Sequence, residues 1–189
     1  MRVISGIARG TKLYTLGGET TRPTLDRVKE SVFNIIQNEI KDSIFLDLFA
    51  GSGAISIEAA SRGAKKIIAC DKSKKAVNII KKNIEKTHME KKIVVYNLDF
   101  IECIENLKNI KFDLVYLDPP YKTDYVINAI RQLIKNDLIN DNSKIIIETD
   151  DKKILESIEN ENLQIIDKRK YGRAIIVFLK ILVKQLGKG

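Results

Sequence analysis

The sequence predicts an α/β fold: a doubly wound, mostly parallel sheet that ends in an antiparallel hairpin. Apolar, β-branched runs of strand length alternate along the chain with amphipathic helical patterns. These runs are almost continuously apolar, which is typical of strands buried on both faces, as in a parallel sheet between two layers of helices. With 189 residues, 44% of them hydrophobic, we expect a single domain over residues 1–189, with its core in 23–180.

The expected elements follow in chain order. Two short strands at 2–5 and 12–16 form a hairpin-like extension within residues 1–22, and a helix starts at Pro23. Strands of the parallel sheet are expected near 43–48, 66–71, 92–96, 112–118 and 143–149. Helices between them are expected near 53–62, 73–87, 100–107, 124–136 and 151–159. Gly172 separates two last apolar runs, 163–171 and 174–179, which predict the antiparallel hairpin.

The strand near 112–118 ends in Asp118-Pro119-Pro120-Tyr121. Two prolines cannot continue a central strand, so the chain leaves the sheet at a fixed angle, with a carboxylate before them and an aromatic ring after them. Such a corner can hold a planar amine: the Asp118 carboxylate and the Pro119 carbonyl accept its hydrogens, and Tyr121 stacks on its face. Taken alone, the tetrapeptide is better explained by a rigid turn with a capping aspartate; a second motif changes that balance.

This second motif follows the strand near 43–48. Asp47 lies at the strand end, and Gly51, Ser52 and Gly53 form a turn into the next helix. Glycines let a ligand approach the backbone, and the helix N-terminus behind them favours an anionic group. Ser56 replaces the third glycine of a dinucleotide fingerprint, and the P-loop lysine is missing. Because Asp47 suits an ammonium, we expect a zwitterion such as the methionyl end of S-adenosylmethionine; a simple tight turn would explain the glycines but not Asp47.

Two more acids follow strand ends: Asp71 after the second strand of the parallel sheet and Asp99 after the third. Since ligands of open α/β sheets bind at the carboxyl ends of the strands, we expect Asp71 to accept the ribose hydroxyls and Asp99 the adenine amine, with Phe100 against the ring. Each acid has an alternative role as a helix N-cap, although Ser73 can cap the helix after Asp71. The alternative is that these acids bind a metal ion. A glycine turn and a double-proline corner are not features of metal sites, so we expect no metal.

Composition excludes several classes of protein. No run of about 18 apolar residues is present to span a membrane, and the first residues lack a signal-peptide core. The two cysteines, Cys70 and Cys103, and the single histidine, His88, are too few and too scattered for a disulfide framework or a zinc site. We therefore expect a cytoplasmic protein, because isolated cysteines suit a reducing compartment.

The charge of the chain favours a polyanionic partner. Lys and Arg number 33 against 25 Asp and Glu, a net charge of +8. Although most of the basic residues are lysines, four of the eight arginines fall within the first 27 residues: Arg2, Arg9, Arg22 and Arg27. Arginine suits bidentate phosphate contacts, so we expect these four to contact the phosphates of the polyanionic partner. The alternative is that Arg22 and Arg27 pair with nearby acids and only pack the first helix.

Several segments together carry a resemblance to a known family: Arg2 to Leu13, Arg22-Pro23-Thr24 with the following residues to Glu30, Asp47 to Ala54, and Asp118 to Tyr121. The combination resembles the bacterial 16S rRNA guanine-N2 methyltransferase (RsmD) family over nearly the whole chain. The Arg-Pro-Thr element is the family-specific part, whereas the glycine turn and the proline corner occur in many amine methyltransferases. The acid after the second strand is often Glu in this family, and Asn is common where Asp99 stands.

The resemblance implies a Rossmann-like S-adenosylmethionine methyltransferase fold with a seven-stranded, mostly parallel sheet. It also implies methylation of the exocyclic N2 of one guanine, with 16S rRNA or the assembling small ribosomal subunit as partner. By resemblance, Gly51, Ser52, Gly53 and Asp71 would bind the cofactor, Asp118 and Tyr121 would act on the base, and Arg22 and Arg27 would contact RNA or order the site. Two alternatives stay open: an adenine-N6 methyltransferase of DNA or RNA, and a non-catalytic RNA-binding protein on the same fold.

Overall fold

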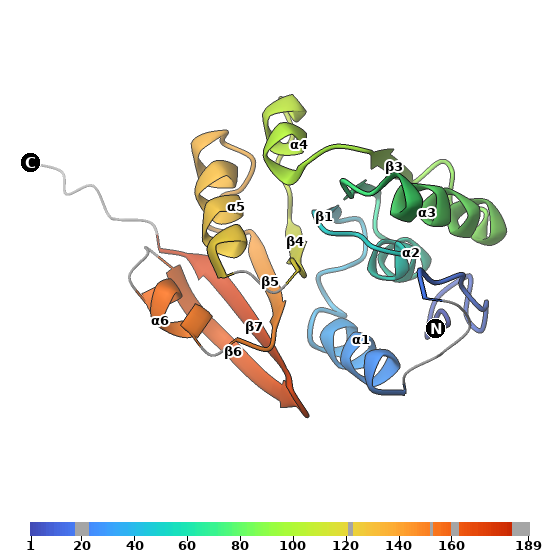
Figure 1. Ribbon diagram of the computed structural model, residues 1–189, viewed down its shortest axis with the longest axis horizontal. Coiled ribbons are helices and arrows are strands. Elements are labelled where there is room, and N and C mark those ends of the chain that lie inside the picture. The colour runs from blue at the N-terminus through green and yellow to red at the C-terminus, as the bar shows by residue number, and fades with distance from the viewer. Residues whose placement is uncertain (18–22, 121–122, 152, 160–162, 183–189) are drawn as a thin grey trace, which may run out of the picture.

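The computed structural model describes residues 1–17, 23–120, 123–151, 153–159 and 163–182. Its seven-stranded sheet has the order β3-β2-β1-β4-β5-β7-β6 (Figure 1). The strands are β1 (Ile44–Asp47), β2 (Lys66–Cys70), β3 (Ile93–Tyr96), β4 (Leu114–Leu117), β5 (Lys144–Thr149), β6 (Leu163–Tyr171) and β7 (Ala174–Ile181). Strands β1 to β5 pair in parallel, whereas β7 is antiparallel to both β5 and β6. The predicted mostly parallel sheet with a C-terminal antiparallel hairpin is confirmed.

Helices cover both faces of the sheet, as the alternation of elements predicts (Figure 1). One face carries α1 (Pro23–Ile35), α2 (Ala54–Ser61) and α3 (Lys74–Thr87), and the other carries α4 (Phe100–Asn106), α5 (Thr123–Lys135) and α6 (Lys153–Glu159). Successive strand side chains alternate between the faces, so Phe45 packs in the core under α1 to α3 and Leu46 in the core under α4 to α6. No helix in the described residues is long and apolar enough to cross a bilayer.

The strand order reverses beside β1. The chain winds outward from β1 to β2 and β3, then returns to add β4 and β5 on the other side of β1. Ligands of open α/β sheets bind beyond the carboxyl ends of the strands at such a reversal. In register, Asp47 is level with Tyr116, and Leu117 is level with Ile147. The residues that follow β1, β4 and β5 therefore meet at one edge of the sheet.

The N-terminal segment forms a hairpin, as expected, but a shorter one than predicted. Within the predicted strands at 2–5 and 12–16, Arg2 and Lys12 form an antiparallel bridge, and backbone hydrogen bonds join Leu13 to Met1, Val3 to Thr11 and Gly10 to Val3. The hairpin is short because part of the segment bonds to α2 instead of extending a ladder. The backbone N–H groups of Ile4 and Ser5 donate to the two carboxylate oxygens of Glu58, at 2.8 and 3.0 Å.

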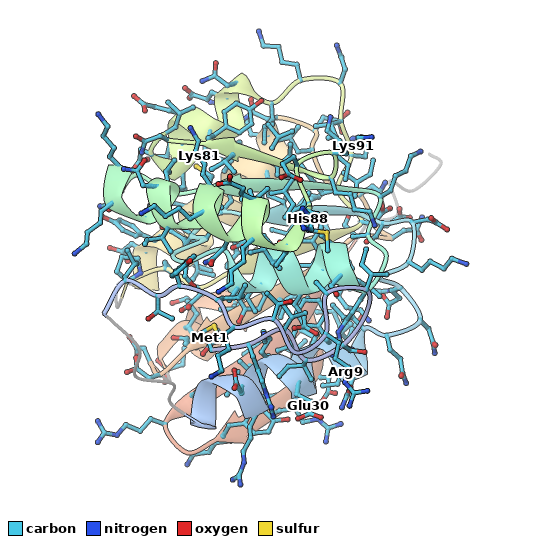
Figure 2. The ribbon with its side chains drawn as sticks, turned by 90° about the vertical axis from the view of Figure 1, so that its right-hand side faces the viewer. Met1, Arg9, Glu30, Lys81, His88 and Lys91 are labelled. Atoms are coloured by element: carbon cyan, nitrogen blue, oxygen red, sulfur yellow. The ribbon has the colours of Figure 1, made fainter. Side chains whose placement is uncertain are left out.

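Glu58 is fully buried and anchors this segment. Lys29 of α1 and Arg62, just after α2, form ion pairs with it at 3.0 and 2.8 Å, so its charge is compensated inside the protein. Gly6, at φ 84°, approaches α2 so closely that a Cβ would stand 1.9 Å from the carbonyl oxygen of Ser61. Figure 2 shows the segment lying across α2, between α1 and α3. The N-terminal segment is thus a fixed part of the surface.

Candidate active site

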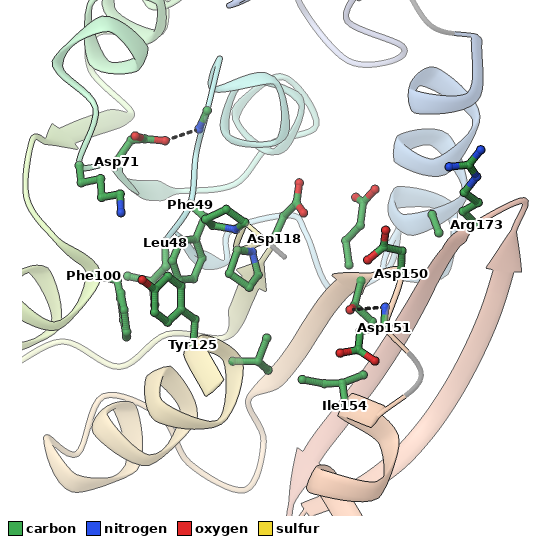
Figure 3. Close-up of a pocket in the computed structure, with 18 of the residues that line it drawn as sticks. Leu48, Phe49, Asp71, Phe100, Asp118, Tyr125, Asp150, Asp151, Ile154 and Arg173 are labelled. Carbon is green, nitrogen blue, oxygen red and sulfur yellow. Dashed lines mark hydrogen bonds between the residues drawn. The ribbon is translucent and has the colours of Figure 1, made fainter. Parts of the chain in front are cut away.

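A cavity of about 1000 Å³ opens at the carboxyl ends of the parallel strands. In the view of Figure 3, Asp71 lies toward one end, Asp150 and Asp151 lie toward the other, and Asp118 lies between them. Residues that the sequence predicts for the site are well represented on its wall: Gly51, Asp71, Asp99, Phe100, Asp118 and Pro119. Asp47, Ser52 and Gly53 are not on it, and Tyr121 lies outside the described residues.

Gly51 and Gly53, the two glycines of the turn after β1, have different roles. Gly51 has φ 54°, and no heavy atom beyond its two chain neighbours lies within 4 Å of the place where a Cβ would stand, so its backbone is open to the cavity. Gly53 has φ 76°, and a Cβ there would come within 3.0 Å of the Ile80 side chain on α3. Gly51 therefore leaves room for a ligand, whereas Gly53 lets α2 and α3 pack closely.

Asp71 ties the glycine turn to the end of β2. One carboxylate oxygen accepts the backbone N–H of Gly51 at 2.9 Å, and the other accepts that of Ser73 at 2.8 Å. The N-cap of α3 is Ser73, whose hydroxyl oxygen accepts the N–H of Ala76. Because each carboxylate oxygen has a further acceptor position, Asp71 can still bind two neighbouring hydroxyls.

Beyond Asp71, the cavity has an aromatic wall. Phe49, Phe100 and Tyr125 pack against one another, with ring centroids 5.3 to 6.4 Å apart. Asp99 lies beside them and is the N-cap of α4, where it forms a capping box with Glu102. The expected alternative role of Asp99 as a cap is thus confirmed, and the same residue also lines the cavity.

Asp118 and Glu148 share the other part of the cavity. Asp118 reaches solvent through the cavity mouth, yet protein atoms surround its carboxyl group. Burial, and after it the negative charge of Glu148, raises the pKa of Asp118 to about 8. Burial also raises the pKa of Glu148, and this is opposed by the hydrogen bond that the Tyr116 hydroxyl donates to its carboxylate. The two carboxyl groups therefore disfavour each other's ionisation.

Comparison with known proteins identifies the family. The model of a family described as "Conserved hypothetical protein 95" matches residues 1–180. The ribosomal RNA small subunit methyltransferase D of Haemophilus influenzae is 40% identical over 167 residues, which are 86% of each chain. The chain belongs to the ribosomal RNA small subunit methyltransferase D family. The resemblance found in the sequence is thereby confirmed.

Solved structures agree with this assignment to the methyltransferase D family. A putative methyltransferase from Escherichia coli, yhhF, superposes with a TM-score of 0.82 at 25% identity and covers 97% of this chain and 99% of its own. A putative methylase from Haemophilus influenzae, HI0767, superposes with a TM-score of 0.77 at 33% identity and covers 96% and 98%. The predicted methyltransferase fold is therefore confirmed.

Asp47 is buried and does not line the cavity, unlike the ligand-binding residue that the sequence predicts. Asp47 is 1% exposed, and its carboxylate accepts a hydrogen bond from the Ser56 hydroxyl at 2.6 Å. Burial raises its pKa to about 7. Ser56, which stands where a dinucleotide fingerprint has its third glycine, thus donates the hydrogen bond that holds Asp47 inside the protein. Asp47 does not line the cavity. A direct contact of Asp47 with a ligand ammonium stays a prediction without support from this geometry.

The three predicted RNA-binding arginines that the structure describes do not line the cavity. Arg2 and Arg9 are exposed on the N-terminal segment, and Arg27 is exposed on α1; Arg22 lies outside the described residues. Arg27 lines a smaller groove of about 310 Å³ together with Arg169 and Tyr171 of β6. Figure 2 shows Arg9 on the outer side of its segment.

The sequence did not point to several residues of the cavity wall, among them Phe49, Tyr125, Glu148 and Arg173. Glu148 had a usable signal, because it lies at the end of a predicted strand like the four acids that were recognised. For Phe49 and Tyr125 no signal distinguishes a wall residue from a core residue. Within the described ranges no cluster of His, Cys, Asp or Glu could hold a metal ion, and His88 is an exposed residue that ends α3.

Proposed function

We propose that this chain transfers a methyl group from S-adenosylmethionine to the exocyclic N2 of a guanine in 16S rRNA. The observation that carries the proposal is that one cavity holds both the Gly51–Asp71 turn and the Asp118-Pro119 corner. The names of the relatives support ribosomal RNA as the substrate class. The chemistry of the cavity supports an amine as the acceptor.

The cavity fits the proposed cofactor. Asp71 has free acceptor positions for the two ribose hydroxyls, and Gly51 leaves the backbone open beside them. Phe49, Phe100 and Tyr125 offer an apolar wall for a purine, with Asp99 next to it to accept an amine hydrogen. The cofactor would supply an electrophilic methyl group on a sulfonium.

The residues of the corner would prepare the acceptor. The N2 lone pair of guanine is delocalised into the ring, so the amine is a poor nucleophile. Asp118 and the Pro119 carbonyl, by accepting the two N2 hydrogens, would localise that lone pair and orient it. Most of the rate gain in such a displacement comes from positioning. A carboxyl group with a pKa near 8 is also a stronger base than an ordinary aspartate, so Asp118 suits the removal of the N2 proton after transfer.

Reaching the base requires that it leave its stack. Unstacking costs a few kcal/mol, and stacking on one aromatic ring returns about 1–3 kcal/mol. We assign this stacking to Tyr121, which follows the double proline. Arg2, Arg9, Arg22 and Arg27 are assigned to the RNA backbone. The anchoring of the N-terminal segment by Glu58 supports this for Arg2 and Arg9, because a fixed segment loses little entropy on binding.

The experiment is methyl transfer with purified protein. Small-subunit RNA and assembling subunits are incubated with methyl-labelled S-adenosylmethionine, and the RNA is digested to nucleosides. Label in N2-methylguanosine supports the proposal. Label in N6-methyladenosine would establish the adenine enzyme instead, and RNA binding without any label would establish the non-catalytic alternative.

A further inference from the structure

The sheet places a second acid beside the Asp118 corner. In the parallel pair of β4 and β5, Tyr116 is level with Ile146 and Leu117 with Ile147. Asp118 follows Leu117 and Glu148 follows Ile147, so the two acids occupy neighbouring positions about 5 Å apart across the two strands. Since side chains alternate along a strand, both acids project to the same side as Tyr116, and both line the cavity.

Tyr116 holds the side chain of Glu148 in place by a hydrogen bond. Its side chain is buried, and its hydroxyl donates a hydrogen bond to Oε2 of Glu148. Burial, and then the charge of Glu148, raises the pKa of Tyr116, so the hydroxyl keeps its proton and remains the donor. A carboxylate has about four acceptor positions, so this single bond holds Glu148 in place and leaves capacity for a ligand.

Guanine and adenine differ in the edge that such a pair of acceptors would face. Guanine presents its N1–H next to its N2 amine, so both groups on this part of the base edge are hydrogen-bond donors. Adenine presents its amine next to N1, which carries a lone pair and no hydrogen. When both groups are ionised, the neighbouring carboxylates of Asp118 and Glu148 match the first edge, whereas the second edge would set a lone pair against a carboxylate oxygen. The ionised form of Asp118 predominates above its raised pKa of about 8.

We propose that Glu148 selects guanine over adenine by accepting the N1–H of the base while Asp118 accepts a hydrogen of its N2 amine. The inference rests on the proposed function and adds to it the residue that determines the base. A site built to bind an N–H group can reject an analogue without it by about 10⁴-fold, because a buried acceptor would be left unpaired. Glu148 is thus a specificity residue at the reacting base.

The test is a substrate that keeps the amine but loses the N1 hydrogen. Small-subunit RNA is assembled by ligation with 2-aminopurine in place of the methylated guanine. Its amine sits at the same ring position, but its N1 is an acceptor. Wild-type protein is expected to methylate this RNA at least about 100-fold more slowly than the guanine RNA, because one N–H group is no longer paired.

Glu148→Gln is the informative variant. The amide of Gln can either accept from an N1–H or donate to a bare N1. We expect it to slow transfer to guanine by roughly 10-fold and to speed transfer to 2-aminopurine, so that the ratio of the two rates falls by at least about 10-fold. This ratio does not depend on how much of the variant is folded, because both RNAs meet the same preparation. Asp150→Asn, which removes another acid of the cavity wall, is the matched control and should keep the wild-type ratio.

The outcomes separate this inference from the proposed function. If wild type methylates guanine but Glu148→Gln slows both RNAs by the same factor, Glu148 is only structural and the inference is wrong. The same holds if wild type methylates both RNAs equally well. If wild type transfers no methyl group to the guanine RNA, the proposed function fails, and the inference falls with it.

Discussion

The Asp71 carboxylate accepts the backbone N–H of Gly51 at 2.9 Å, so the residue that follows β2 fixes the turn that follows β1. The two loops are 20 residues apart in the chain and meet because β1 and β2 are neighbouring parallel strands. One side chain thereby shapes the open backbone at Gly51 and keeps its own oxygens at the cavity edge. The cofactor end of the site depends on this contact.

Replacing Asp71 should therefore weaken cofactor binding in two ways. Asp71→Ala removes the acceptor for the ribose hydroxyls and releases the Gly51 turn, and we expect the affinity for S-adenosylmethionine to fall by at least about 10-fold, the effect of removing one charged hydrogen bond. Titration calorimetry measures it. Ser73→Ala is the control: it removes the N-cap of α3 and should lower stability by about 1 kcal/mol while affinity is kept. Equal affinities of wild type and Asp71→Ala would contradict the assignment.

The raised pKa of Asp118 predicts how activity depends on pH. If the carboxylate form accepts the amine hydrogens, kcat/KM should rise between pH 6 and 8 and level off above the pKa of about 8. The acids that raise this pKa, after burial, are Glu148, Asp47 and Asp150. Removing one of these charges, as in Asp150→Asn, should move the rise to lower pH. A flat profile over this range would show that Asp118 does not titrate in the free enzyme.

Asp47 predicts a pH dependence of stability. Its pKa is raised from 3.8 to about 7, so its neutral form is favoured in the folded state. This stabilisation is fully present below pH 3.8 and is lost as pH rises through 7. Asp47→Asn keeps an acceptor for the Ser56 hydroxyl but never ionises. At about 1.4 kcal/mol per pKa unit, the variant should gain up to about 4 kcal/mol over wild type between pH 4 and 8. Urea unfolding at both pH values measures the difference, and a constant difference would contradict it.

The N-terminal arginines predict a salt signature. Removing one arginine that binds a phosphate should lower the slope of log affinity for RNA against log salt by about 1, with the melting temperature unchanged. Arg2→Ala, Arg9→Ala and the double variant should therefore flatten the salt dependence in steps. Lys81→Ala, an exposed cation on α3, is the matched control (Figure 2). An unchanged slope with a lower melting temperature would mean that the segment is structural.

The features of the fold that depend on local sequence patterns were predicted correctly. The strands were found because apolar runs such as Ile67 to Ala69 are buried on both faces, and the last hairpin was found because Gly172, at φ 61°, marks its turn. The cap of α3 by Ser73 followed from side-chain chemistry alone. Each of these features depends on residues close together in the chain.

Pairings between distant residues could not be predicted in the same way. The N-terminal hairpin is shorter than predicted because Glu58, more than 50 residues away, accepts the backbone N–H groups of Ile4 and Ser5. Asp47 is held by a hydrogen bond from Ser56, which lies in the first turn of α2. Glu148 joins the site only through the register of β4 with β5. A periodic pattern carries no information on any of these pairings.

Nucleoside mass analysis of 16S rRNA tests the central claim most directly. The rRNA comes from cells that lack this gene and from the same cells complemented with wild type or with Asp118→Ala. We expect one N2-methylguanosine per rRNA to be lost without the gene, restored by wild type, and not restored by Asp118→Ala, whose transfer rate should fall by about 10³-fold. An unchanged N2-methylguanosine content on loss of the gene, or the loss of N6-methyladenosine instead, would contradict the account.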